Sequence, residues 1–118
     1  MKQEKDSKLF EINEEINKLT ENIYENESEQ RDLIRTEDEL HTQFRNNKLL
    51  FEDLKSSWKH GEMRYHVQDA YTELKHHERK MTQALGDEMH QLKQKSKFFK
   101  EKESELQTEI KLLSMEDY

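Results

Sequence analysis

Apolar residues follow a seven-residue repeat along the first half of the chain. Steps of three and four residues run from Leu9 to Trp58 without a slip, and 11 of the 15 positions are apolar. A strict seven-residue repeat places one stripe along a helix and requires a partner helix against it. The repeat predicts a helix over about residues 7–58, with Ser7 or Asp6 as its N-cap. This stripe, called seam one, consists of Leu9, Ile12, Ile16, Leu19, Ile23, Asn26, Gln30, Leu33, Glu37, Leu40, Phe44, Asn47, Phe51, Leu54 and Trp58.

A second repeat, called seam two, follows in the other half, and 12 of its 15 positions are apolar. Its spacing slips by one residue between His77 and Met89, a stretch that contains Gly86. The repeat predicts a second helix over about residues 62–114. Seam two consists of Met63, Val67, Ala70, Leu74, His77, Met81, Leu85, Met89, Leu92, Ser96, Phe99, Glu103, Leu106, Ile110 and Leu113.

The two seams are out of phase by two residues, which is roughly 200° around a helix. An unbroken helix would carry them on opposite faces, whereas a turn at about 59–61 lets them meet. Trp58-Lys59-His60-Gly61 provides that break, because glycine adopts the left-handed backbone that ends helices. The predicted fold is all-α: one long antiparallel two-helix hairpin, a coiled coil, over residues 1–118. An antiparallel dimer of continuous helices is the alternative.

The composition argues against an enzyme. Charged residues make up 40% of the chain and hydrophobic residues 31%, with a mean hydropathy of -1.33, which is too little apolar mass for an enclosed pocket. Cysteine is absent, and no two of the six histidines are three or four residues apart, so one helix offers no two-histidine metal pair. We therefore expect no catalytic site, metal or cofactor; a small enzyme remains the least favoured class.

The charge balance and the apolar runs exclude other classes of partner. The net charge is -7, and both halves are acidic: residues 1–59 carry 10 basic and 15 acidic groups, and residues 60–118 carry 10 and 12. An acidic chain without a basic track predicts no nucleic-acid partner. No apolar run approaches the 18 residues of a membrane span, and the first six residues lack the apolar core of a signal peptide.

Thirteen apolar residues lie outside both seams, and the hairpin register brings several of them to the same level. Tyr24 falls near Phe98, and Phe10 falls near Leu112. A hairpin that buries only one stripe per helix is marginally stable alone, so we expect it to associate with other helices. The hypothesis is two lateral patches; packing of these side chains against the seams of the hairpin itself is the alternative. The predicted partner-binding residues are Phe10, Tyr24, Leu49, Leu50, Tyr71, Phe98 and Leu112.

The central Trp58-Lys59-His60-Gly61 resembles the bend of the WXG-motif helical hairpins of type VII secretion, with one extra residue between tryptophan and glycine. Tyr65 and Asp69 fit the Tyr-x-x-x-Asp/Glu export signal of those proteins, and Phe99 with Glu103 is a looser match. Length and charge make the chain similar to the small helical proteins associated with LXG toxins of Gram-positive bacteria.

The resemblance implies a targeting factor or chaperone, present in the cytoplasm, that binds the helical N-terminal domain of such a toxin. A second small helical protein as a further partner, homo-oligomers of the chain alone, and export together with the cargo are left open. A structural coiled-coil rod, or a stalk chaperone of another secretion or phage assembly, is the alternative function.

Overall fold

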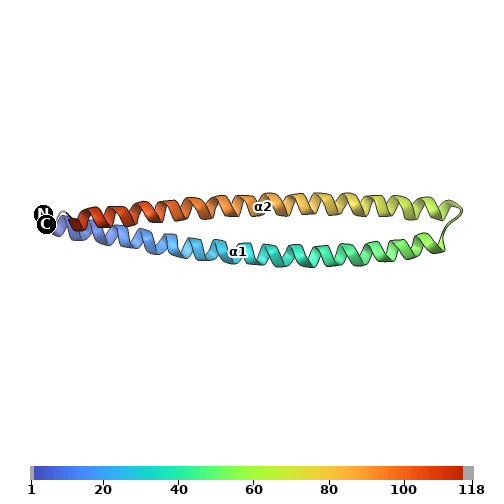
Figure 1. The fold of residues 1–118 in the computed structure, drawn as a ribbon, viewed down its shortest axis with the longest axis horizontal. Coiled ribbons are helices and arrows are strands. Elements are labelled where there is room, and N and C mark those ends of the chain that lie inside the picture. The colour runs from blue at the N-terminus through green and yellow to red at the C-terminus, as the bar shows by residue number, and fades with distance from the viewer. Residues whose placement is uncertain (1, 116–118) are drawn as a thin grey trace. The chain divides into compact units, whose positions relative to one another are not determined.

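The computed structural model describes residues 2–115, which form an antiparallel helical hairpin of two α-helices (Figure 1). Helix α1 is Lys2–Ser57 and helix α2 is Glu62–Met115. The predicted all-α hairpin is confirmed. Helix α1 begins before the predicted residue 7, so Ser7 and Asp6 lie inside it and neither is an N-cap. The last residues of the predicted domain, 116–118, lie outside the described residues, as does residue 1.

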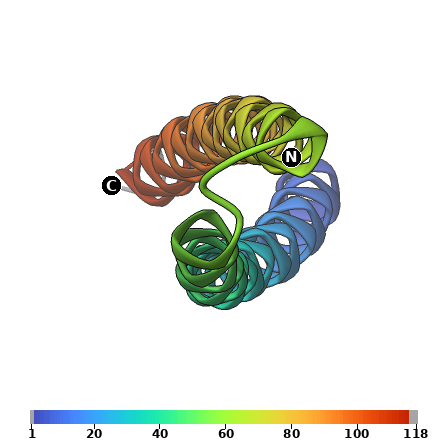
Figure 2. The same cartoon turned by 90° about the vertical axis from the view of Figure 1, so that its right-hand side faces the viewer.

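Residues 58–61 connect the helices (Figure 2). The Trp58 N–H still donates to the Leu54 carbonyl at 2.8 Å, which closes the final turn of α1. Gly61 has a φ of 88°, a left-handed backbone that favours glycine. It directly precedes Glu62, the first residue of α2, and lies four positions beyond the end of α1. The predicted role of Gly61 at the end of helix one is therefore wrong, although its left-handed conformation is present.

The chain forms two compact units, each a pair of antiparallel helix segments. Unit 1 pairs the start of α1, up to Gln30, with α2 from His90 onward. The core of unit 1 follows the predicted seams: Ile12, Leu92 and Leu106 are buried, each at most 7% exposed. Half-buried members of both seams flank them. The repeat therefore predicts the inward faces of unit 1 correctly.

A hydrogen bond joins the two helices across the core of unit 1. Asn26 is 5% exposed, and its Nδ2 donates to the Leu92 carbonyl at 2.9 Å. Its Oδ1 accepts a hydrogen bond from Gln30 Nε2 at 2.7 Å, so both ends of the buried amide are paired. Leaving such a group unpaired costs about 1–3 kcal/mol. The bond to Leu92 thus favours one register of the two helices over the alternatives.

Unit 2 extends over Arg31–Met89 and contains the turn. Leu33 and Val67 are buried, and seven further seam positions of this unit are half-buried as predicted. These seven are Glu37, Leu40, Phe44, Phe51, Leu74, Leu85 and Met89. At the other positions the inward face departs from the predicted seams. Asn47, Ala70 and His77 were expected to face inward and are exposed. At these three levels the residue that follows in the sequence is half-buried instead, namely Lys48, Tyr71 and Glu78. Four further seam positions, Leu54, Trp58, Met63 and Met81, are at least 41% exposed, so their assignment to the packed seam is wrong.

Electrostatics explains part of this shift. Lys48 Nζ lies 2.7 Å from Glu78 Oε2, and both side chains are mostly shielded from solvent. A short ion pair between the helices holds Lys48 and Glu78 beside the inward face. Tyr71 displaces Ala70 because a larger side chain buries more apolar surface at the same level.

Candidate partner-binding surfaces

Helix α1 carries two exposed aromatic side chains in unit 1, Phe10 at 65% and Tyr24 at 68% exposure. They are 14 residues apart, which is two full heptads, so they share one face of the helix. Each follows a seam position directly, Leu9 and Ile23 respectively. The pair therefore forms one flank of unit 1, called the α1 flank.

Helix α2 carries an equivalent pair, Phe98 and Leu112, also exposed and also 14 residues apart. Each precedes a seam position by one residue; the Phe98 ring meets the ring of its neighbour Phe99 edge to face, with centroids 6.1 Å apart. Because the helices are antiparallel, a residue just after a seam position in α1 and one just before a seam position in α2 face opposite sides. Tyr24 and Phe98 thus share a level but lie on opposite flanks, and the second pair is called the α2 flank.

The three predicted partner-binding residues of unit 2, Leu49, Leu50 and Tyr71, do not share one environment. Leu49 and Leu50 are more than half exposed. Tyr71 is half-buried, and its ring meets the Phe51 ring edge to face at a centroid distance of 6.1 Å. The Nζ atoms of Lys55 and Lys75 each lie 4.5 Å from the centre of the same ring. Tyr71 therefore packs within the hairpin, as the alternative interpretation expected, whereas Leu49 and Leu50 remain available at the surface.

The export-signal match lies near the start of α2. Tyr65 and Asp69 are both exposed and lie one helical turn apart, so one recognition surface would contact both. The looser match, Phe99 with Glu103, packs within the hairpin, because both side chains are half-buried. Glu103 Oε2 also accepts a hydrogen bond from Thr20 Oγ1 at 3.2 Å. Exposure thus favours Tyr65 and Asp69 over Phe99 and Glu103 as a readable signal.

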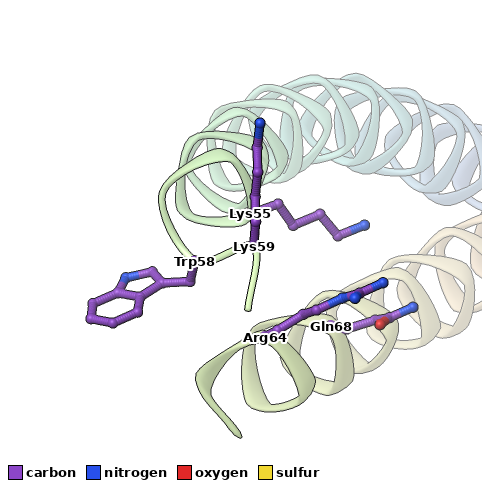
Figure 3. Close-up of a pocket in the computed structure, with 5 residues that line it drawn as sticks. All are labelled: Lys55, Trp58, Lys59, Arg64 and Gln68. Atoms are coloured by element: carbon purple, nitrogen blue, oxygen red, sulfur yellow. The ribbon is translucent and has the colours of Figure 1, made fainter. Parts of the chain in front are cut away.

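A basic surface beside the turn was not predicted from the sequence. Two shallow hollows of unit 2, of about 350 and 390 Å³, share the side chains of Lys55 and Gln68. Five cations line them and no carboxylate does; these cations, Lys55, Lys59, Arg64, Lys75 and Arg79, are called the basic groove. The indole of Trp58, at the rim of the first hollow, points away from Arg64 and Gln68 (Figure 3). The basic groove is not evident in the sequence, because acidic residues alternate with these cations along the chain.

No three His, Cys, Asp or Glu side chains of residues 2–115 converge as a metal site requires. His41 Nε2 lies 3.5 Å from Glu37 Oε1, on its own helix. Neither helix of the described chain combines the length and the apolar character needed to cross a bilayer.

The fold and these surfaces define a small all-α hairpin protein with partly exposed apolar flanks. The chain belongs to the DUF3958 family, described as a protein of unknown function, which matches residues 7–113. The match covers nearly all of both helices and the turn between them. No curated protein and no solved structure matches the chain.

Proposed function

We propose that this protein is a non-enzymatic targeting factor or chaperone that binds the helical N-terminal domain of an LXG-type toxin for type VII secretion. The observation that carries the proposal is the exposure of four large apolar side chains on the two flanks of unit 1, Phe10, Tyr24, Phe98 and Leu112. Exposed apolar surface at repeated helical positions is typical of a face that receives another helix. The resemblance of the central Trp58–Gly61 segment to type VII hairpins supports the kind of partner.

The two flanks fit a bundle with a helix on each side of the hairpin. Each flank presents two apolar anchors 14 residues apart, a separation of about 21 Å along a helix. An amphipathic partner helix with apolar residues at the same heptad spacing would contact both anchors of a flank. The toxin domain occupies one flank in this proposal, and the opposite flank is open to a second helix of that domain or to a second small helical protein.

Co-expression with the helical N-terminal domain of an LXG toxin tests the proposal. We expect the hairpin and the N-terminal domain of the toxin to co-purify as a complex of defined mass by light scattering. The double variant Tyr24→Ser, Phe98→Ser removes one anchor from each flank, so whichever flank the toxin domain occupies loses a contact worth more than about 1 kcal/mol, and the complex should weaken at least about fivefold. Absence of a complex with the wild-type chain contradicts the proposal and favours a structural rod.

Ile34→Ser is the matched control, because Ile34 is an exposed apolar residue of unit 2 that belongs to neither flank. We expect this variant to bind the toxin domain as the wild type does. Equal weakening by the control would show that loss of exposed apolar area, rather than the flanks, explains the effect.

The exposed pair Tyr65 and Asp69 is the proposed export signal. Tyr65→Ala and Asp69→Ala should each reduce toxin secretion by bacterial cells, measured in the culture medium, while the purified complex forms normally. Loss of both secretion and complex formation would assign Tyr65 and Asp69 to partner binding instead.

A further inference from the structure

The cations of the basic groove have no acidic counterparts among the described residues of the hairpin. Elsewhere lysines pair with carboxylates: Lys48 with Glu78 at 2.7 Å, and Lys100 with Glu27 at 3.7 Å. Among residues 2–115, none of the five groove cations forms an ion pair. Two of them, Lys55 and Lys75, are held against the face of the same tyrosine ring. Like charges gathered around one ring repel each other, so an acidic occupant would stabilise the groove.

The same chain carries a complementary acidic surface in unit 1. Residues 2–30 contain nine acidic and four basic side chains. Seven of the nine acidic side chains occupy the part of the α1 surface turned away from its seam, and all seven are exposed. Lys8 and Lys18 are the two basic side chains on the same part of the surface, because they lie seven residues from Glu15 and Glu11 respectively. The acidic stripe consists of Glu4, Glu11, Glu14, Glu15, Glu21, Glu25 and Glu29.

The two surfaces match in extent and in their apolar borders. The groove cations on α2 run from Arg64 to Arg79, about 22 Å at 1.5 Å per residue, and the acidic stripe is longer than this. Exposed aromatic side chains adjoin both: Trp58 at the rim of the groove, and Phe10 and Tyr24 beside the stripe. Charge pairs bordered by apolar contacts are the usual composition of a specific interface.

We propose that the basic groove of one copy binds the acidic stripe of a second copy, so that the protein self-associates when its partner is absent. A nucleic acid is a poorer occupant, because the chain has a net charge of -7 and would repel a phosphate backbone at long range. The self-association uses the basic groove in unit 2 of one copy and the acidic stripe in unit 1 of another. It is separate from the proposed function, because it requires no toxin.

Light scattering of the pure protein tests the contact. At about 0.01 M salt charges act over about 30 Å, and at 1 M over about 3 Å. We therefore expect a mass above that of one chain at low salt, and dissociation at high salt. A single-chain mass in both conditions overturns the proposal, as does a salt-independent oligomer. Tighter binding of a labelled single-stranded DNA probe than of a second copy, measured at low salt by fluorescence anisotropy, also overturns it.

Charge reversal identifies the surfaces. Lys55→Glu, Lys59→Glu, Lys75→Glu should weaken self-association at least about tenfold. The matched control Lys93→Glu, Lys97→Glu, Lys100→Glu changes net charge equally, on unit 1, and should weaken it far less. Equal weakening by both variants overturns the proposal. Far-ultraviolet circular dichroism checks that each variant remains helical.

A mixing experiment covers the case in which reversal alone alters the fold. Glu11→Lys, Glu14→Lys, Glu21→Lys reverses the acidic stripe and should also weaken self-association. Mixed with the groove-reversed variant, it should restore association, because the reversed groove is acidic and the reversed stripe is basic. Two helical variants that remain single chains when mixed overturn the assignment of groove to stripe.

Discussion

Units 1 and 2 share one heptad pattern but pack it differently. In unit 1 the predicted seams face inward, three aliphatic residues are buried, and Asn26 bonds across the core. In unit 2 the inward face contains the Lys48–Glu78 ion pair and Tyr71, whose ring contacts two lysines. Leu54 and Met63 beside the turn are exposed. A regular repeat therefore establishes that two helices pair, and the individual side chains decide how closely they pack.

The largest expected difference between the units concerns their leucines. Leu106→Ala should lower the free energy of unfolding by about 2–4 kcal/mol, because it removes a buried side chain and leaves a cavity in unit 1. Leu54→Ala makes the same chemical change at a 41% exposed position of unit 2, and should cost about 0.5 kcal/mol or less. Urea unfolding monitored by circular dichroism measures both. Equal losses would show that the turn-proximal seam packs as tightly as unit 1.

Tyr71 should be the most important aromatic residue for the stability of unit 2. Tyr71→Ala removes the contact with the Phe51 ring and the ring face shared by Lys55 and Lys75, and should cost about 1–2 kcal/mol. Tyr71→Phe keeps the ring and is the control, with a change below about 0.5 kcal/mol. Thermal unfolding compares the two. If Tyr71→Ala leaves stability unchanged while weakening partner binding, Tyr71 acts as an exposed anchor instead.

Asn26 should determine pairing more than stability. Asn26→Leu replaces a buried polar group with an apolar one at a seam position, so the free energy of unfolding should stay within about 1 kcal/mol of wild type or rise. Without the bond to Leu92, other registers and larger assemblies become accessible, so light scattering should detect more than one species at high salt. A strongly destabilised variant of a single mass would show that the bond contributes stability rather than register.

The smallest effect should come from the ion pair of unit 2. Lys48→Gln should lower the free energy of unfolding by about 0.5–1 kcal/mol at low salt, because the pair is partly shielded from solvent. The loss should be smaller at high salt, because salt screens the attraction between the two charges. Lys100→Gln disrupts the longer and more exposed pair with Glu27 in unit 1, and should have no measurable effect on thermal unfolding. A larger loss from Lys100→Gln than from Lys48→Gln would reverse this ranking.

The hairpin itself could be predicted from the sequence because its signals are strong and independent. The glycine near the middle and the phase offset between the seams both require a reversal. In unit 1 even the polar seam residues were placed correctly: Asn26 and Ser96 are buried. Their positions followed from the uninterrupted repeat around them, without reference to their own chemistry.

The shifted positions in the seam of unit 2 could not be predicted, because two residues compete at each of them. Steps of three then four and of four then three are both compatible with a heptad, so Val67 to Leu74 passes equally well through Ala70 or Tyr71. The same ambiguity holds for Asn47 against Lys48 and for His77 against Glu78. Contacts between the helices decide which of the two residues faces inward, and a periodic pattern along one helix contains no information on those contacts. The basic groove escaped prediction for the same reason, because its cations come from both helices.

Hydrogen exchange of the pure protein, followed by mass spectrometry at high salt, tests most directly the contrast between the two units. Amides open according to local packing, so segments with a buried core exchange slowly. We predict strong protection over residues 12–30 and 92–106, and exchange faster by at least about tenfold over residues 47–70. Equal protection of these segments would contradict the account, because the helix ends beside the turn would then be as firmly packed as unit 1.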